Sequence, residues 1–193
     1  MAVKRKSLVL DASAFIAGFD PLALKEEAYS VPEVEVELLD GSMPKIRFEA
    51  SLNSGRLKVI KPENRYIDLA ESISSEVGDI SFLSKADLAI LALALQLKDM
   101  GLKPVIATDD YSIQNVAEKM GIKYMPLSNL GIRYQLNWLL YCPACGKKYP
   151  PNEKLTICKN CGTELKRKPE RRRPIKRKHA NKVGSKKGES QET

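Results

Sequence analysis

The chain has 193 residues, enough for one domain of ordinary size and a smaller module, and 43% of them are hydrophobic. Its net charge of +8 lies at one end: residues 166–193 hold 12 Lys and Arg against 3 Glu, whereas residues 1–165 hold 20 basic and 21 acidic residues. A membrane span is excluded, because the most apolar run, Leu88 to Leu97, is too short, and the N-terminus lacks a signal-peptide pattern. We expect a cytoplasmic protein.

The first half of the chain alternates short apolar runs with helical patterns. The sequence Ser30-Val-Pro-Glu33 resembles a capping box with proline in the first turn, so a helix should follow it to about Leu39. Apolar residues at helical spacing predict another helix over residues 63–77. The expected strands are 7–10, 28–31 and 57–60, and the other expected helices are 14–17 and 45–53.

The second half continues the alternation. Ser84 and Asp87 form another capping box, which opens a helix from Leu88 to Met100 that is apolar nearly all round and should be buried. The expected elements after it are a strand at 104–108, a helix at 113–120, a strand at 122–125 and a linking strand within 132–141. Strands that alternate with helices predict an α/β fold with a parallel sheet covered on both faces.

All four cysteines lie in one short window, in two CxxCG sequences. Each CxxC directs two thiolates at one point, and Gly146 and Gly162 allow a positive φ in the turn. Four thiolates complete the tetrahedral shell of one Zn²⁺ ion, so the zinc should be structural. The alternative of two disulfides does not suit a cytoplasmic chain. The predicted zinc ligands are Cys142, Cys145, Cys158 and Cys161, in a small all-β ribbon.

From residue 166 the composition changes to Lys, Arg, Pro, Gly and Ser, with almost no apolar residues. Such a segment cannot bury a core, so we predict a disordered basic tail over residues 166–193. The expected division is therefore 1–131 for the α/β domain, 132–165 for a linker strand and ribbon, and 166–193 for the tail. The alternative for the tail's charges is a merely solubilising role. The predicted nucleic-acid contacts are Arg171, Arg172, Arg173, Lys176, Arg177 and Lys178.

Acidic residues follow two of the predicted strands. Asp11 ends the first strand, and Asp109 and Asp110 follow the strand at 104–108, while Glu37 and Asp87 lie in early helical turns. Ligands bind at the carboxyl ends of parallel strands, and carboxylates that converge there repel one another without a counterion. Mg²⁺ or Mn²⁺ suits such an oxygen site. Taken singly, Asp87 and Asp110 could be helix caps and Glu37 a solvated charge.

Carboxylate and metal chemistry is also what remains if the chain is an enzyme. The lone histidine, His179, lies in the basic tail, which excludes histidine acid–base catalysis in the body. Every cysteine is committed to the ribbon, so the body has no thiolate nucleophile.

The sequences DASAFI, VEVEL, LSKADLAILALALQL and ATDDYSIQNVAEKMG resemble the PIN-domain nucleases over residues 5–130. The resemblance implies that Asp11, Glu37, Asp87 and Asp110 hold one or two Mg²⁺ or Mn²⁺ ions. Glu33 and Glu35 are rivals for Glu37. It also implies that Ser13 and Thr108 orient these carboxylates, and that Asp109 takes a variable middle position.

A PIN domain followed by a four-cysteine ribbon is more specific than either part, and resembles the family of archaeal NIN-one-binding endonucleases. That resemblance implies metal-dependent cleavage of precursor 16S rRNA near its mature 3′ end, on the nascent small ribosomal subunit and beside other assembly factors. The long basic tail is not part of the family pattern. Two other classes stay open: a PIN-type toxin that cuts tRNA or mRNA, and a non-catalytic RNA-binding assembly factor.

Overall fold

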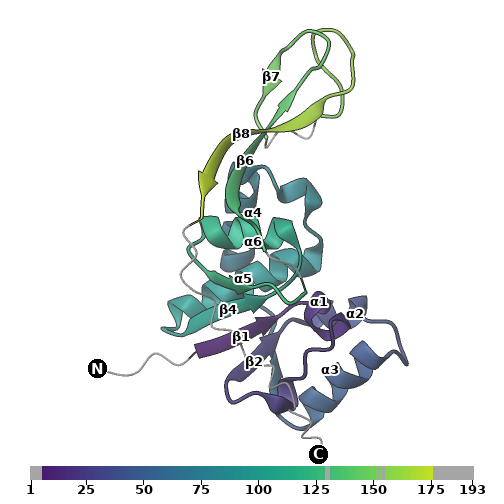
Figure 1. Cartoon of the computed structure of the whole chain (residues 1–193), viewed down its shortest axis with the longest axis vertical. Coiled ribbons are helices and arrows are strands. Elements are labelled where there is room, and N and C mark those ends of the chain that lie inside the picture. Colours follow the sequence, from purple (N-terminus) through teal and green to yellow (C-terminus); the bar gives the residue numbers. More distant parts are fainter. Residues whose placement is uncertain (1–5, 129–130, 152, 154, 176–193) are drawn as a thin grey trace, which may run out of the picture.

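The structure is a computed structural model that describes residues 6–128, 131–151, 153 and 155–175. Its larger part is built on a five-stranded parallel sheet with the strand order β3-β2-β1-β4-β5 (Figure 1). The strands are β1 (Lys6–Leu10), β2 (Glu27–Ser30), β3 (Leu57–Val59), β4 (Lys103–Ala107) and β5 (Lys123–Met125). The chain adds β2 and β3 on one side of β1 and then β4 and β5 on the other. This order confirms the predicted α/β sheet and places its switch point between β1 and β4.

Helices connect the strands and cover the sheet. They are α1 (Ala12–Ile16), the 3₁₀ turn η1 (Pro21–Ala23), α2 (Pro32–Glu37), α3 (Met43–Asn53), α4 (Asn64–Val77), the 3₁₀ turn η2 (Ile80–Phe82), α5 (Lys85–Asp99) and α6 (Tyr111–Lys119). Right-handed crossovers in the two directions bring α1 and α3 to one face and α4, α5 and α6 to the other. The contacts agree: α3 packs on α1 and β3, whereas α5 packs on α4, α6, β1 and β4.

The core lies between the sheet and α5. Successive residues Ile90 to Ala94 of α5 are completely buried, which confirms the prediction of a helix apolar nearly all round. Val9 of β1 pairs in register with Ile106 of β4, and both side chains are completely buried. Burial on both faces is typical of the central strands of a parallel sheet, and it fixes the ends of β1 and β4 side by side. In the part of the chain that is described, no helix has the length and apolar character needed to span a membrane.

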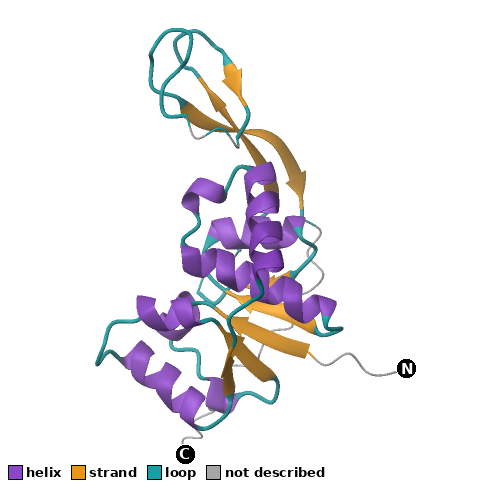
Figure 2. Cartoon of the chain, turned by 180° about the vertical axis from the view of Figure 1, so that it is seen from behind, coloured by secondary structure: helices purple, strands orange, loops and turns teal. Residues whose placement is uncertain are grey.

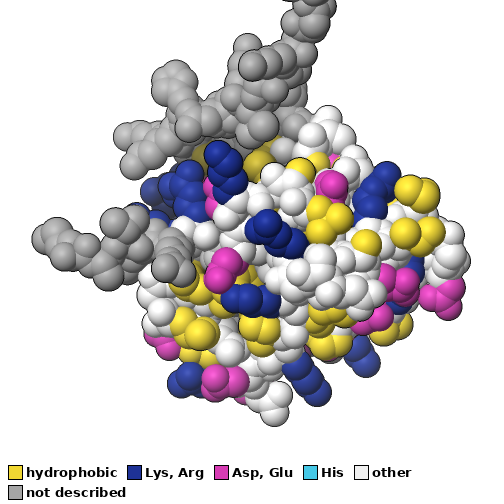
Figure 3. Space-filling view, turned by 90° about the horizontal axis from the view of Figure 1, so that it is seen from below, with side chains coloured by type: hydrophobic (Ala, Val, Ile, Leu, Met, Phe, Trp, Pro, Cys, Tyr) yellow, Lys and Arg dark blue, Asp and Glu magenta, His cyan; other side chains and the backbone are white. Residues whose placement is uncertain are grey.

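A second sheet of three antiparallel strands, in the order β7-β6-β8, follows the parallel one. Its strands are β6 (Tyr134–Tyr141), β7 (Lys148–Tyr149) and β8 (Lys166–Pro174). We call the paired β6 and β8 the arm, and residues 142–165, which the arm carries at its end, the ribbon. Figure 2 shows the ribbon extending away from the helical body. At the opposite end of the molecule, basic, acidic and hydrophobic side chains are interspersed, as its near-neutral charge predicts (Figure 3).

Two predictions were wrong. Helix α2 begins at Pro32 with Val31 as its N-cap and without a side-chain cap, because Ser30 ends β2 and its hydroxyl donates to the carbonyl of Leu10 at 2.8 Å. Residues 166–174 are not disordered, because β6 supplies a partner strand along the whole of β8, from Tyr134 opposite Pro174 to Tyr141 opposite Lys166. The rest of the predicted tail, residues 176–193 with His179, lies outside the described residues.

Candidate active site and zinc site

Asp11 lies at the carboxyl end of β1 and caps α1. Its Oδ1 accepts a hydrogen bond from the Ala12 amide at 2.7 Å. Its Oδ2 accepts from two hydroxyls, that of Ser13 at 2.8 Å and that of Thr108 at 2.9 Å. The side chain is buried, so these three donors fix the orientation of the carboxylate. Ser13 and Thr108 therefore both bind the Asp11 carboxylate, and their orienting role for a metal ligand stays a prediction.

The three residues after β4 extend this network. Thr108 Oγ1 accepts from the amide of Asp110 at 3.1 Å, and Ser13 Oγ accepts from the amide of Asp109 at 3.2 Å. Asp110 caps α6: its Oδ1 accepts from the Ser112 amide at 2.6 Å. The Asp109 side chain points away to the loop after β5, where it accepts hydrogen bonds from the backbone and hydroxyl of Ser128. Asp109 therefore holds the loop, whereas the Asp110 side chain caps α6.

Glu37 and Asp87 meet at Ser84, although they come from different helices. The Ser84 hydroxyl donates to Glu37 Oε1 at 3.2 Å, and the Ser84 amide donates to Asp87 Oδ2 at 2.7 Å. The capping box of Ser84 and Asp87 at the start of α5 is present as predicted. Of the rivals to Glu37, Glu35 instead pairs with Lys45 at 3.4 Å.

These four carboxylates influence one another through their charge. Partial burial raises the pKa of Glu37, and the charges of Asp87 and Asp11 raise it further, against the Ser84 hydrogen bond. Burial likewise raises the pKa of Asp87, and the charges of Asp11 and Asp110 add to it, against the hydrogen bonds from Ser84. The four acids therefore share one edge of the sheet.

The side-chain groups of this site are carboxylates and hydroxyls, which offer oxygen atoms as ligands. In the described part of the chain, no Lys or Arg forms an ion pair with Asp11, Glu37, Asp87 or Asp110. The carboxylates are spread, since among the residues described no three of them come within 4.8 Å of one another. Helix capping uses one oxygen each of Asp87 and Asp110, so the other oxygen stays available to a ligand. This donor set fits Mg²⁺ or Mn²⁺, which take oxygen ligands and keep bound waters.

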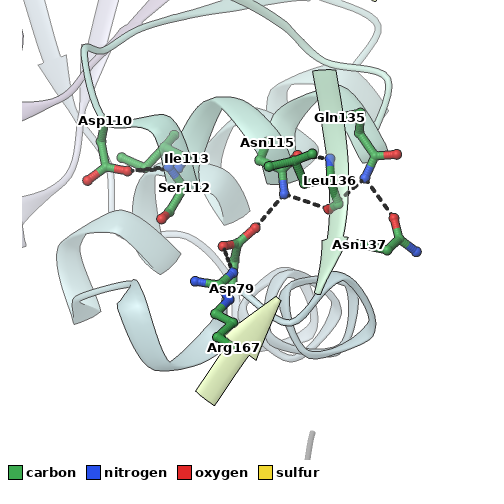
Figure 4. A network of polar contacts seen from close by, with 9 residues as sticks. All are labelled: Asp79, Asp110, Ser112, Ile113, Asn115, Gln135, Leu136, Asn137 and Arg167. Atoms are coloured by element: carbon green, nitrogen blue, oxygen red, sulfur yellow. Dashed lines mark hydrogen bonds and ion pairs between the residues drawn. The ribbon is translucent and has the colours of Figure 1, made fainter. Parts of the chain in front are cut away.

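Sequence reasoning missed Asp79, an acid between α4 and η2 that is buried as Asp11 is. Figure 4 shows its carboxylate between the guanidinium of Arg167 and the side-chain amide of Asn115 in the middle of α6, and Asp110 at the start of that helix. Burial raises the pKa of Asp79, and the charge of Asp110 adds to the effect, while the bonds from Asn115 and Arg167 oppose it. A signal was present in the sequence, because Gly78-Asp79 directly follows the predicted helix 63–77.

The four cysteines converge in the ribbon as predicted. Their sulfur atoms all lie within 4.8 Å of one another, and all four thiols are free. The Sγ atoms of Cys142 and Cys161 are 3.4 Å apart, and those of Cys145 and Cys158 are 3.6 Å apart, far beyond a disulfide length. Such spacing suits four thiolates about one Zn²⁺ ion. Gly146 and Gly162 have φ of 74° and 72°, as the tight turns require.

Two tyrosines lie beside the ribbon's cysteines. Tyr149 is buried and its hydroxyl lies 3.1 Å from Cys158 Sγ. A hydrogen bond from that hydroxyl lowers the pKa of Cys158 to about 6, which favours the thiolate that zinc binds. Tyr149 therefore belongs to the ribbon's core and is not free to stack on a base. Tyr141 instead lies under the ammonium of Lys168, 4.5 Å from the ring centre.

The predicted RNA-contacting residues divide in two. Arg171, Arg172 and Arg173 are exposed on β8, while Lys176, Arg177 and Lys178 lie outside the described residues.

Comparison with known proteins agrees with this architecture. The family model described as "PIN domain of ribonuclease" matches residues 8–97. Endoribonuclease Nob1 from Methanocaldococcus jannaschii is 39% identical over 84% of this chain and 78% of its own length. Endoribonuclease Nob1 from Pyrococcus abyssi is 36% identical over 90% of this chain and 99% of its own. A match over 84% of 193 residues includes Cys142 to Cys161 wherever it begins. The chain belongs to the Nob1 family of PIN-domain endoribonucleases.

A second group of relatives, the VapC ribonucleases, matches a shorter part of the chain. Ribonuclease VapC1 from Thermoplasma acidophilum is 34% identical over 69% of this chain and 66% of its own length. A match of that length can end before Cys142, so the PIN part alone can account for it. The match to the Methanocaldococcus jannaschii relative, in contrast, is long enough to include the ribbon wherever it begins.

Proposed function

We propose that this chain is a divalent-metal-dependent endoribonuclease that cleaves precursor 16S rRNA near its mature 3′ end. The catalytic part is supported by two pairs of acids without an ion-paired Lys or Arg among the described residues: Asp11 and Asp110 share a hydrogen bond partner in Thr108, and Glu37 and Asp87 share one in Ser84. The Nob1 relatives, which are named as endoribonucleases, support RNA as the substrate. The precursor rRNA is inferred from the combination of a PIN domain with a four-cysteine ribbon.

The four carboxylates are the proposed ligands of one or two Mg²⁺ or Mn²⁺ ions. Such a cation, when bound, lowers the pKa of a water molecule and neutralises charge on the phosphodiester. Asp11 is the most firmly oriented of the four, because Ser13 and Thr108 donate to the same oxygen. Hydrogen-bonded partners of this kind orient metal ligands.

The reaction expected at this edge is hydrolysis with water as the nucleophile. The water oxygen forms a bond to phosphorus as the bond from phosphorus to the 3′ oxygen breaks, leaving a 5′-phosphate and a 3′-hydroxyl. The water loses its proton to solvent or to a carboxylate oxygen that is not engaged by the cation, and the departing 3′ oxygen takes up a proton from solvent.

The arm and ribbon are proposed to hold the RNA. Three consecutive exposed arginines on β8 contact phosphates in this proposal: Arg171, Arg172 and Arg173. Phosphate contacts position the substrate and do not read its sequence. Residues 1–131 would then perform the chemistry, on the nascent small subunit in the cytoplasm and beside other assembly factors.

A toxin-like function, with tRNA or mRNA as the substrate, is the second candidate, and the likeness to Ribonuclease VapC1 favours it. The zinc ribbon weighs against it, because cleavage of a free RNA needs no such appendage. The rate of tRNA cleavage relative to the rate of rRNA fragment cleavage separates the two candidates.

Glu37→Gln is the sharpest test, because Glu37 is exposed and its only hydrogen bond within the described residues is to Ser84. With Mn²⁺ and an RNA fragment that spans the mature 3′ end, we expect cleavage to fall at least about 100-fold. Asp68→Asn, at an exposed acid of α4, is the matched control and should cleave normally. Full activity of Glu37→Gln contradicts the proposed site. Equal cleavage of tRNA and of the rRNA fragment favours the toxin-like alternative.

A further inference from the structure

Arg167 of the arm packs between Trp138 of the arm itself and the segment of the nuclease part that holds Asp79 and Phe82. Its guanidinium is stacked between two rings, 3.9 Å from the centre of Trp138 on β6 and 4.2 Å from the centre of Phe82 in η2. One of its nitrogens forms an ion pair with Asp79. Arg167 thus bridges the arm and the segment between α4 and α5.

Asp79 is held from a second side by α6. Its Oδ2 accepts a hydrogen bond from the side-chain amide of Asn115. The same amide group of Asn115 also bonds the backbone of Leu136 on β6, donating to its carbonyl at 2.9 Å and accepting from its amide at 2.7 Å. Asn115 lies five residues after Asp110, so the helix that Asp110 caps is tied to the arm as well.

Residues 78–84, which we call the α4–α5 connection, touch the arm at their first residue. Gly78 has a φ of +81°, and a Cβ built on it would lie 2.7 Å from the Cβ of Pro151 and 3.0 Å from that of Trp138. Backbone and arm therefore approach so closely that a side chain at residue 78 cannot be accommodated without movement. The close approach and the Arg167 ion pair are independent observations of the same docking.

The other end of the α4–α5 connection is Ser84, which holds two of the proposed metal ligands. Its hydroxyl donates to Glu37, and its amide donates to Asp87. Only four residues lie between Asp79, which Arg167 binds, and Ser84, which holds the two carboxylates. One of the four is Phe82, which Arg167 covers. A displacement of Asp79 is transmitted through this short segment to Glu37 and Asp87.

We propose that Arg167 is a positioning residue for the carboxylate site: by holding the α4–α5 connection against the arm, it sets the spacing of Glu37 and Asp87 and strengthens divalent-cation binding there. The inference rests on the proposed function, because it takes these carboxylates as the cation ligands. Removing Arg167 leaves the Asp79 carboxylate buried without its cation and close to the charge of Asp110. The connection then moves to bring Asp79 to water, and Ser84 moves with it.

The test is a titration of the full-length, zinc-loaded chain with Mn²⁺. The electron paramagnetic resonance signal of free Mn²⁺ measures how much of the ion stays unbound. We expect Arg167→Ala to bind Mn²⁺ about 10-fold more weakly than the unaltered chain, the lower range for loss of a group that orients metal ligands. Arg65→Ala is the matched control, because Arg65 also lies over a ring, that of Tyr66, and pairs with Glu63, but on the exposed face of α4. It should bind Mn²⁺ normally.

Zinc content and thermal unfolding are measured on the same samples. If Arg167 has a purely structural role, Arg167→Ala lowers the unfolding temperature but leaves the Mn²⁺ affinity of the folded chain unchanged. The proposal is therefore overturned if zinc-loaded Arg167→Ala binds Mn²⁺ within twofold of the affinity of the unaltered chain. If Arg167→Ala does not fold, Arg167→Lys takes its place under the same criterion. That variant keeps the charge but loses the planar group that fits between Phe82 and Trp138.

Glu37→Gln separates this inference from the function on which it rests. If Glu37→Gln weakens Mn²⁺ binding and Arg167→Ala does not, the carboxylate site stands and only the positioning role fails. If Glu37→Gln leaves Mn²⁺ binding unchanged, the proposed metal site itself is wrong, and the role of Arg167 is overturned with it.

Discussion

The hydroxyl of Thr108 donates a hydrogen bond to Asp11 at 2.9 Å, and the two residues are 97 positions apart in the chain. Asp11 follows β1 and Thr108 follows β4, so this bond joins the two strands at the switch point. Thr108 Oγ1 also accepts from the Asp110 amide. One hydroxyl therefore positions two of the proposed metal ligands.

Thr108→Val tests that arrangement, because valine keeps the shape of threonine and removes the hydroxyl. Buried Asp11 loses one of its donors and the partly buried Asp110 amide loses its acceptor, at a cost of about 1–3 kcal/mol in the free energy of unfolding. We expect Mn²⁺ affinity to fall about 10-fold. Thr108→Ser restores the hydroxyl and should recover the affinity. Unchanged Mn²⁺ binding in Thr108→Val would show that the hydroxyl does not orient these ligands.

The raised pKa values of Glu37 and Asp87 predict how stability depends on pH without divalent cations. Their ordinary values are 4.5 and 3.8, and in the folded chain both are higher, so the folded state binds more protons than the unfolded state within that window. The free energy of unfolding should therefore decrease as the pH rises from about 4 through the raised values.

Mn²⁺ or Mg²⁺ should cancel this decrease at neutral pH and have less effect near pH 4, where Glu37 and Asp87 bind more protons because their pKa values are raised. Thermal unfolding across pH, with and without Mn²⁺, measures both effects. Glu37→Gln should flatten the cation-free profile, and Asp68→Asn should not. A profile that rises over the same range would contradict the assignment of raised pKa values.

The sequence predicted the parallel sheet well because its strands are short apolar runs that end at acids or turns. Asp11 and Asp110 follow such runs directly, and burial on both faces leaves a central strand little freedom. The prediction failed at the start of α2 because the Ser30 hydroxyl can either cap a helix or bind a neighbouring strand. In the structure it donates to the carbonyl of Leu10 at the end of β1. Local pattern does not decide between a cap and a bond to a distant strand.

The arm shows why the rest could not be predicted. The sequence KRKPERRRP has no apolar pattern, so nothing local marks it as a strand. Its order comes from pairing with β6, and from the stacking of Arg167 on Trp138. Asp79 was missed for the same reason, because its partners, Asn115 and Arg167, lie 36 and 88 residues away.

Zinc should be required for the ribbon and dispensable for the parallel sheet. The ribbon's buried cluster is small, consisting of Cys142, Cys158 and Tyr149 with three partly buried leucines, so zinc binding supplies about 10 kcal/mol of its folding free energy. Cys158→Ser should abolish zinc binding, measured by elemental analysis, and retain the helical circular dichroism. Tyr149→Phe removes only the hydroxyl that contacts Cys158 and should weaken zinc binding while the ribbon still folds. Full zinc content in Cys158→Ser would exclude the four-thiolate site.

The exposed arginines of β8 should govern the salt dependence of RNA binding. Replacing Arg171, Arg172 and Arg173 together by alanine removes up to three phosphate contacts. The slope of the logarithm of the binding constant against that of salt concentration should then become shallower by about 2 for a single strand. Replacing the exposed Lys25, Arg56 and Lys61 of the nuclease part together is the matched control. An equal change in both triple variants would mean that the arm is not the principal RNA contact.

Gly78→Ala should weaken the docking of the arm. A positive φ alone costs alanine about 1–2 kcal/mol, and here the added Cβ also meets Pro151 and Trp138. Gly101→Ala isolates the first term, because Gly101 has a φ of +84° and no atom within 4 Å of an added Cβ. We expect the free energy of unfolding to fall further in Gly78→Ala than in Gly101→Ala, measured by urea denaturation. Because the same contact begins the α4–α5 connection, Mn²⁺ affinity should also fall in Gly78→Ala alone. If the free energy of unfolding falls equally in the two variants, the arm can move away from the added Cβ at Gly78 at no cost. The docking of the arm would then depend on Arg167.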